Sequence, residues 1–149
     1  MSEHRVRVSW VNSSEDFVYE TFNRDHLWTF DNGAEIKASS APAFMGNPDC
    51  VDPEEGFVGA LSSCHMLTFL AISAKKRLTV TSYEDDAVGF LEKNENGKLA
   101  VTRIILRPKV AWGKDETPTQ EEVEALHQKA HGACFIANSI LTEVAVEPR

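Results

Sequence analysis

The chain of 149 residues carries 15 Lys and Arg residues against 23 Asp and Glu residues, a formal net charge of -8. This length suits one domain with a substantial core, and the negative charge argues against binding to nucleic acid or to an anionic membrane surface. The N-terminal residues lack the apolar core of a signal peptide, and the longest apolar run, 66–72, is too short to span a bilayer. We therefore expect a single cytoplasmic domain over residues 1–149 that acts without nucleic acid or membrane.

Strand patterns fill the first forty residues. Apolar and polar residues alternate over 4–11, and 17–22 is interpreted as a second strand. Segments 26–30 and 34–38 are joined through an Asn-Gly pair, which is a strong hairpin signal. These strands predict a small antiparallel sheet, followed by a loop that leads to the next element.

A long helix is predicted to begin at Pro53. Asp52 is suited to cap the free N–H groups, and Glu55 completes an Asp-x-x-Glu capping box. From residue 57 to residue 72 apolar side chains leave almost no polar face, so we expect a helix that is buried on nearly every side. Cys64 lies in its middle, which raises the question of whether this thiol serves packing or chemistry.

Two further strand segments, 79–93 and 98–112, are separated by another Asn-Gly turn and predict a second antiparallel pair. Pro108 cannot donate a ladder hydrogen bond, so its strand must be bulged or lie at an edge there.

The C-terminal part begins with a helix predicted to start within 117–122, where more than one capping box fits. Gly132 is predicted to break this helix, 134–140 to form a short helix, and 141–147 to form the last strand. The buried stripe of the helix is predicted to contain Val123, Leu126 and Ala130. The order of elements predicts an α+β fold with largely antiparallel sheets.

The three cysteines argue against a disulfide framework and in favour of free thiols, for which inert burial is the default role. A thiol with an unperturbed pKa of about 8.5 is mostly protonated at neutral pH, so a reactive Cys64 needs a cation or a hydrogen-bond donor nearby. Cys134, at the break between two helices, and Cys50, in the loop before the long helix, are both candidates to lie near it. A zinc site built from Cys64, Cys134 and His131 lacks a paired-ligand signature.

Three segments carry a resemblance to a known family. They are Asp52-Pro53-Glu54-Glu55 with the helix that contains Ser63-Cys64-His65, the distant Cys134-Phe-Ile-Ala-Asn-Ser segment, and Asn23-Arg24-Asp25-His26. In these segments, and in the order of elements over essentially the whole chain, the sequence resembles the OsmC/Ohr family of thiol peroxidases. The resemblance implies an α+β homodimer with intertwined protomers, antiparallel sheets, a long buried central helix and two active sites at the subunit interface.

The same resemblance implies a function in peroxide stress defence. The expected activity is reduction of organic hydroperoxides, hydrogen peroxide or both, with a lipoyl-type or other dithiol as reductant and without metal or bound organic cofactor. Cys64 corresponds to the peroxidatic cysteine and Cys134 to the resolving cysteine. Arg24 and Glu54 correspond to the groups that orient and ionise Cys64, with Glu54 holding the guanidinium through a two-pronged contact.

Helix geometry qualifies the role of Glu54. If 53–76 is one straight helix, the ten positions from Glu54 to Cys64 span roughly 15 Å, which is too far for both to serve one site in the same subunit. We hypothesise that Glu54 reaches the Cys64 site of a partner subunit or acts indirectly by placing Arg24. A distance above about 8 Å from Glu54 to every Cys64 sulfur would contradict the direct version, since charges interact usefully at about 4 to 6 Å.

Phe135 follows Cys134 at a position where the Ohr branch usually carries proline, so this sequence is closer to OsmC-type members. The choice between organic and hydrogen peroxide, and the identity of the reductant, therefore stay open. Three other functions also stay open: a thiol redox sensor, a cysteine hydrolase that pairs Cys64 with His65 or His131, and a non-enzymatic binding domain on the same fold.

Overall fold

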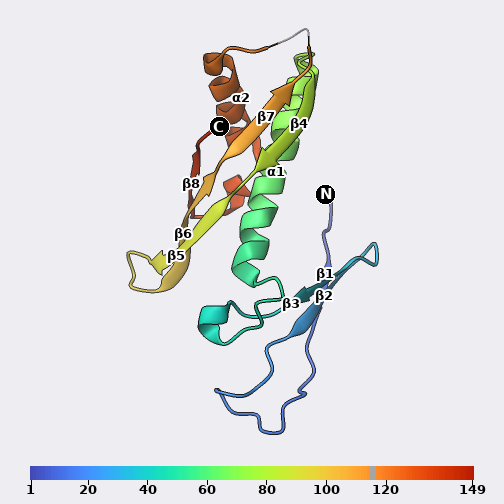
Figure 1. Ribbon diagram of the computed structural model, residues 1–149, viewed down its shortest axis with the longest axis vertical. Coiled ribbons are helices and arrows are strands. Elements are labelled where there is room, and N and C mark those ends of the chain that lie inside the picture. The colour runs from blue at the N-terminus through green and yellow to red at the C-terminus, as the bar shows by residue number, and fades with distance from the viewer. Residues whose placement is uncertain (115–116) are drawn as a thin grey trace. The chain divides into compact units, whose positions relative to one another are not determined.

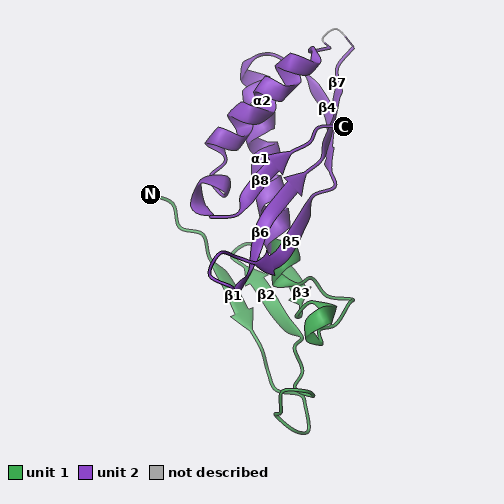
Figure 2. Cartoon of the chain, turned by 90° about the vertical axis from the view of Figure 1, so that its left-hand side faces the viewer, with its two compact units in different colours: residues 1–56 green, residues 57–149 purple. Residues whose placement is uncertain are grey.

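The computed structural model of the chain describes residues 1–114 and 117–149 and divides them into two compact units (Figures 1 and 2). The first unit comprises Met1–Gly56 and the second comprises Phe57–Arg149. The prediction that residues 1–149 act as one domain stays a prediction.

The first unit contains a three-stranded antiparallel sheet with the order β1-β2-β3, in which β1 is Val6–Ser9, β2 is His26–Phe30 and β3 is Glu35–Ala38. The predicted hairpin is confirmed, and its turn uses Gly33 with a φ of 82°. A short 3-10 helix, η1 at Pro42–Phe44, follows.

The strand predicted at 17–22 is wrong, because this segment forms bends and turns. The Phe22 N–H donates to the Val18 carbonyl at 3.0 Å, which is a helix-like turn contact and not a ladder contact. The aromatic rings of Phe17 and Phe22 pack on each other with centroids 5.5 Å apart. Local aromatic packing therefore takes the place of strand pairing here.

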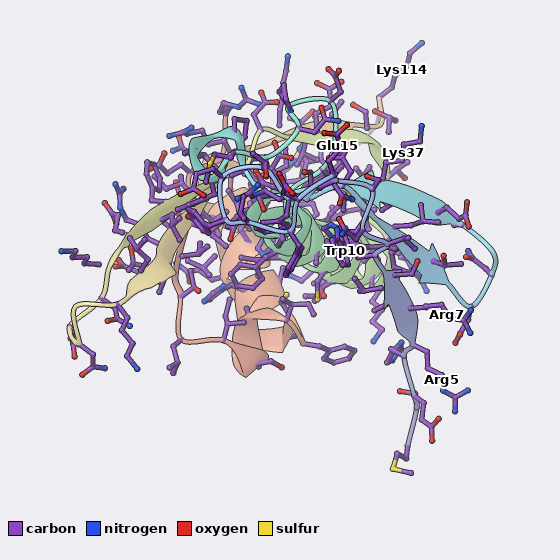
Figure 3. The ribbon with its side chains drawn as sticks, turned by 90° about the horizontal axis from the view of Figure 1, so that it is seen from below. Arg5, Arg7, Trp10, Glu15, Lys37 and Lys114 are labelled. Carbon is purple, nitrogen blue, oxygen red and sulfur yellow. The ribbon has the colours of Figure 1, made fainter. Side chains whose placement is uncertain are left out.

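All four residues of β1 are exposed within the chain. Arg5, Arg7 and Trp10 extend along this N-terminal segment in Figure 3. Large apolar side chains are exposed on the same segment and in the turns that follow it, namely Val6, Val8, Trp10, Val11, Phe17, Val18 and Tyr19.

The long helix α1 spans Pro53–Lys75 and begins as the capping residues predict. The Glu55 N–H donates to the Asp52 carboxylate at 2.8 Å, and the Asp52 N–H donates to the Glu55 carboxylate at 3.2 Å. Within the first unit, Gly56 lies against Trp28 so closely that a Cβ would come within 2.7 Å of the indole ring. A side chain at position 56 would therefore force the tryptophan to move.

Burial of α1 differs from the expectation. The fully buried residues Leu61, His65, Phe69 and Ser73 follow one another at intervals of four and so form a single stripe. Leu67 is 60% exposed, and Ala60, Ser63, Ala71 and Ala74 are also exposed. The prediction of burial on nearly every side is wrong for the single chain, because the strands and α2 of the second unit cover one face only.

Within the described residues, α1 is long enough and apolar enough to span a membrane, judged by its length and composition alone. Core helices of soluble proteins can have the same length and composition, so these properties do not assign α1 to a membrane. The expectation that the protein acts without a membrane stays a prediction.

The second unit holds the remaining strands and helices (Figure 1). Their bounds are β4 Val80–Asp85, β5 Val88–Lys93, β6 Leu99–Leu106, β7 Pro108–Trp112, α2 Gln120–Ala133, η2 Ala137–Ser139 and β8 Glu143–Val146. Strands β4 and β7 pair antiparallel, as do β5 and β6, whereas β8 pairs parallel with β6. The expected pair of long strands is thus interrupted between β6 and β7, where Pro108 begins β7.

Helix α2 carries the predicted type of capping box, with Thr119 accepting from the Glu122 N–H and Glu122 accepting from the Thr119 N–H. Gly132 does not break the helix, which continues to Ala133 and ends at Cys134. The short helix expected at 134–140 is only the 3-10 turn η2. The α+β class with largely antiparallel sheets and one long helix is confirmed, and the intertwined homodimer stays a prediction.

Candidate functional site

The structure brings Cys64 and Cys134 together, although seventy positions separate them. Cys64 lies in the middle of α1 and is partly buried, whereas Cys134 is the C-cap residue of α2 and is fully buried. The Cys64 side chain packs against the buried cluster that Cys134 forms with Leu61, Ile104 and Leu106. The two side chains are hydrogen-bond partners, and both cysteines are free thiols.

The chain that follows α2 supplies the polar surroundings of both sulfur atoms. It turns sharply after Cys134, so that the Ala137 N–H donates to the Cys134 sulfur at 3.5 Å. The N–H groups of Phe135 and Ile136 donate toward Cys64. Consecutive N–H groups that converge on one atom favour a negative charge there without any cationic side chain.

These contacts shift the pKa values of the two thiols in opposite directions. Burial is the largest influence on Cys64 and raises its pKa, but hydrogen bonds from Cys134, from the Ile136 and Phe135 N–H groups and from Thr68 outweigh it, so the pKa of Cys64 is lowered. Burial, followed by the hydrogen bond to Cys64, raises the pKa of Cys134. Cys64 is therefore the thiol that ionises first, and Cys134 keeps its proton and donates it as a hydrogen bond.

Thr68 lies one helical turn after Cys64 on the same face of α1. Its hydroxyl donates to the Cys64 carbonyl at 2.8 Å and is also close enough to contribute a hydrogen bond to the Cys64 sulfur. A hydroxyl has one proton, so the carbonyl and a Cys64 thiolate compete for it.

Arg24 and Glu54 belong to the first unit, and their contacts there do not form the expected pair. The Arg24 guanidinium donates to the Tyr19 and Phe22 carbonyls at 2.7 and 2.9 Å and lies 4.0 Å over the Phe22 ring. The four ion pairs found among residues 1–114 and 117–149 include neither Arg24 nor Glu54. The two-pronged contact is thus not made in the single chain, and the roles of both residues stay predictions.

The sequence interpretation did not predict a buried pair of histidines, and it gave no role to His127. His65 on α1 and His127 on α2 are 1% and 2% exposed, their rings stack with centroids 5.3 Å apart, and His65 Nε2 lies 3.0 Å from His127 Nδ1. Burial, chiefly, lowers the pKa of each to about 4, so both are neutral at pH 7. A signal was present, since His127 falls on the same helical face as the predicted buried stripe of α2.

The contact of His65 with His127 bears on the hydrolase alternative. A cysteine hydrolase that pairs Cys64 with His65 would need that imidazole at the Cys64 sulfur, but the Nε2 of His65 is bonded to His127. The pairing of Cys64 with His131 stays open. Among residues 1–114 and 117–149, no group of three His, Cys, Asp or Glu side chains is arranged to hold a metal ion. Cys50, a third free thiol, lies in the first unit.

Comparisons with known proteins agree with this architecture. A family model for OsmC-like proteins matches residues 46–149. An OsmC-like protein of unknown function from Vibrio cholerae is 48% identical, with a TM-score of 0.96 and 100% of each chain covered. The uncharacterized protein YmaD of Bacillus subtilis is 26% identical over an alignment of 129 positions, and the match covers 84% of this chain and 84% of that protein.

Structures of proteins named for hydroperoxide resistance show the same fold at lower identity. The organic hydroperoxide resistance protein OhrB of Bacillus subtilis is 16% identical, with a TM-score of 0.70 over 99% of this chain and 98% of that one. Because the family model matches more than half of the chain, we conclude that the chain belongs to the OsmC-like protein family.

Proposed function

We propose that this protein is a cytoplasmic, homodimeric two-cysteine peroxidase that reduces hydroperoxides at Cys64 with Cys134 as the resolving thiol. The observation that carries the proposal is the pairing of a thiol whose pKa is lowered with a buried thiol whose pKa is raised. The family includes proteins named for organic hydroperoxide resistance, which supports this chemistry for the present chain.

The reaction needs only the two thiols and an external dithiol. The Cys64 thiolate attacks one peroxide oxygen, a sulfur–oxygen bond forms as the oxygen–oxygen bond breaks, and the leaving alkoxide or hydroxide takes a proton from solvent. Cys64, now oxidised by two electrons to a sulfenic acid, is attacked by Cys134. A disulfide and one water molecule result, with the Cys134 proton going to the departing hydroxide.

An external dithiol, of the lipoyl type or another, closes the cycle by two thiol–disulfide exchanges. It leaves as a cyclic disulfide and restores both cysteines. The Phe135 and Ile136 N–H groups favour the thiolate of Cys64 at the start of each cycle. Since the same short segment carries Cys134, it places the donors and the resolving thiol together.

Arg24 and Glu54 enter the proposal as groups supplied by a partner subunit. Helix α1 is continuous from Pro53 to Lys75, so Glu54 and the Cys64 of the same helix are separated by roughly 15 Å of helix rise. The guanidinium of Arg24 would then bind the developing oxyanion, and Glu54 would hold that guanidinium in place. The exposed apolar side of α1 supports a homodimer, since apolar helix faces that the chain leaves uncovered are typical of interfaces.

Mass spectrometry after stoichiometric cumene hydroperoxide tests the proposal. We expect a disulfide between Cys64 and Cys134, which is absent from Cys64→Ser and is replaced by overoxidised Cys64 in Cys134→Ser. Unmodified thiols in the wild-type protein would refute the peroxidase. A disulfide that forms without catalytic turnover in the presence of dihydrolipoamide would favour the redox sensor instead.

A further inference from the structure

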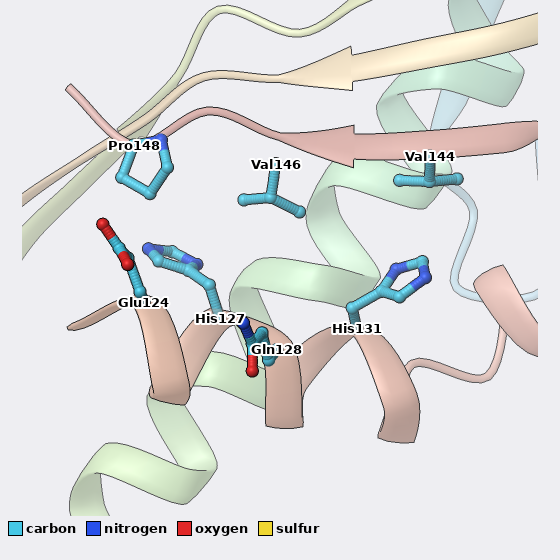
Figure 4. A pocket seen from close by; sticks show the side chains of 7 residues that line it. All are labelled: Glu124, His127, Gln128, His131, Val144, Val146 and Pro148. Carbon is cyan, nitrogen blue, oxygen red and sulfur yellow. The ribbon is translucent and has the colours of Figure 1, made fainter. Parts of the chain in front are cut away.

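Two buried histidines join α1 to α2 close to the cysteines. His65 Nε2 lies 3.0 Å from His127 Nδ1, and their rings stack with centroids 5.3 Å apart. Apart from the contact between the two thiols, this is the one side-chain hydrogen bond between α1 and α2 among residues 1–114 and 117–149. His131, on the next turn of α2, lines a cavity with Val144 and Val146 of β8 (Figure 4). The link between the two helices therefore consists of His65 and His127.

Each histidine of this link belongs to the same helix as one of the cysteines. His65 directly follows Cys64 in α1, and His127 precedes Cys134 by seven positions. Seven positions are about two helical turns, or roughly 10.5 Å, so His127 and Cys134 lie on the same face of α2. The buried Ala130 lies between them on that face. The face of α2 that carries the histidine contact therefore also carries the resolving thiol at its end.

The other contacts between the two helices are apolar. Phe69 of α1 belongs to one buried cluster with Leu126 and Ala130 of α2, and its ring stacks on His127 with centroids 4.3 Å apart. Apolar burial is non-directional, so such contacts tolerate small sliding movements, whereas a hydrogen bond restricts both distance and angle. The hydrogen bond between the imidazoles is thus the contact that fixes the position of α2 along α1.

The position of α2 matters for the disulfide between Cys64 and Cys134. A disulfide forms only when the two sulfur atoms are held together, and ordering α2 against α1 costs conformational entropy. Where the histidine contact exists, this entropy is lost when the chain folds. Where the contact is broken, the same entropy is lost when the disulfide forms, which makes the disulfide less stable relative to the dithiol.

We propose that His65 and His127 are positioning residues, whose hydrogen bond holds the end of α2 so that Cys134 stays within reach of the Cys64 sulfur. The inference rests on the resolving role proposed for Cys134. Neither histidine needs to touch the peroxide, because both act through the placement of α2. By linkage, the disulfide stabilises the histidine contact by the same factor by which the contact stabilises the disulfide.

Equilibration with glutathione tests the proposal on the full-length protein, with Cys50→Ser as the background so that only two cysteines remain. Protein dithiol and glutathione disulfide react to give the Cys64–Cys134 disulfide and two glutathione molecules, and mass spectrometry after acid quenching measures the equilibrium constant. His127→Phe keeps a flat ring against α1 but cannot form the hydrogen bond. We expect its equilibrium constant to fall about threefold to tenfold, because a linked change cannot exceed the net free energy of one hydrogen bond.

A rescue variant and a stability control separate positioning from a general loss of structure. The double variant His65→Gln with His127→Asn replaces the bonded ring nitrogens by side-chain amides that can bond to each other, so its constant should lie within about twofold of the wild-type value. Ile105→Ala truncates a side chain on the face of β6 opposite the buried Ile104 and Leu106, so it lowers stability but should leave the constant unchanged.

Three results would overturn the positioning role: an unchanged constant in His127→Phe, an equal fall in Ile105→Ala, or a double variant as low as His127→Phe. The equilibrium involves no hydroperoxide. A protein that shows the expected shifts but no peroxidase activity would therefore support the positioning role and contradict only the proposed function.

Discussion

The reactivity assigned to Cys64 depends on neutral donors within hydrogen-bond distance and not on a cation in the same unit. The Cys134 side chain lowers the pKa of Cys64 more than the Ile136 and Phe135 N–H groups do, and it acts against the desolvation that would otherwise raise that pKa. The resolving cysteine thus has two roles, since it activates its partner before it reduces it.

The two roles of Cys134 are separated by a pair of substitutions. Cys134→Ala removes both the donor and the resolving thiol, so the pKa of Cys64 rises and less of it is thiolate at pH 7. Cys134→Ser removes only the resolving thiol, because its hydroxyl still donates. We expect iodoacetamide to alkylate Cys64 more slowly in Cys134→Ala than in Cys134→Ser, roughly threefold at pH 7, a difference of about 0.6 kcal/mol.

The measurement is the pH dependence of the alkylation rate, followed by mass spectrometry to assign the modified cysteine. Cys50→Ser serves as the background in all proteins, so that Cys64 is the thiol that reacts in the Cys134 variants. Identical pH profiles for the serine and alanine variants would show that the Cys134 hydrogen bond does not stabilise the Cys64 thiolate.

At the scale of elements, local signals were predictable and long-range pairings were not. The capping boxes at Asp52 and Thr119 and the turn at Gly33 depend on residues within four positions, and all three are confirmed. The parallel pairing of β8 with β6 joins residues about forty positions apart and has no local signal. The strand expected at 17–22 failed because strand-forming residue types show only that a strand is compatible with the segment, not that a partner strand exists.

Part of the candidate site was also predictable from the sequence and part was not. The types and order of Cys64 and Cys134 were predictable through the family resemblance, but the donors at Phe135 and Ile136 are backbone groups that no residue type reveals. His127 was missed because its residue type alone does not distinguish a buried histidine from an exposed one, and its partner His65 lies on another helix.

The contact between α1 and α2 through His65 and His127 predicts acid-sensitive stability. Burial lowers the pKa of both to about 4 from 6.5. Between these values the unfolded chain binds protons that the native protein does not, so the contribution is fully present above about pH 6.5 and is lost as the pH falls toward about 4. For one histidine the loss is on the order of 3 kcal/mol.

Urea unfolding at a series of pH values from 7.5 to about 4 measures this loss. The double variant His65→Gln with His127→Gln cannot bind these protons, so its free energy of unfolding should depend less steeply on pH even though it is lower overall. His4→Gln, which removes an exposed histidine, should follow the wild-type protein. A double variant as steep as the wild-type protein would assign the acid sensitivity to other groups.

For the whole molecule, the exposed side of α1 predicts the surface through which the proposed homodimer forms. Leu67 is 60% exposed at the centre of this side. Leu67→Glu would bury a carboxylate without a partner in such an interface. We therefore expect the dissociation constant of the homodimer to increase by about 100-fold or more. Leu99→Glu, at a leucine 58% exposed at the start of β6, is the matched control and should leave the mass unchanged in light scattering.

The proposed homodimer also predicts where Glu54 acts. A site built from both subunits and a site built from one subunit respond differently when each chain of a dimer carries a different inactivating substitution. Cys64→Ser removes the nucleophile, and Glu54→Gln removes the carboxylate that is proposed to act in trans; each homodimer should lose most of its peroxidase activity. A heterodimer of the two, co-expressed with different affinity tags and isolated through both, has one site in which the Cys64 of one chain meets the Glu54 of the other. If Glu54 acts across the interface, that site is intact and the heterodimer should have about half of the wild-type activity per dimer, as two-fold symmetry requires. If Glu54 acts within its own chain, each of the two sites carries one defect and the heterodimer is no more active than the better homodimer.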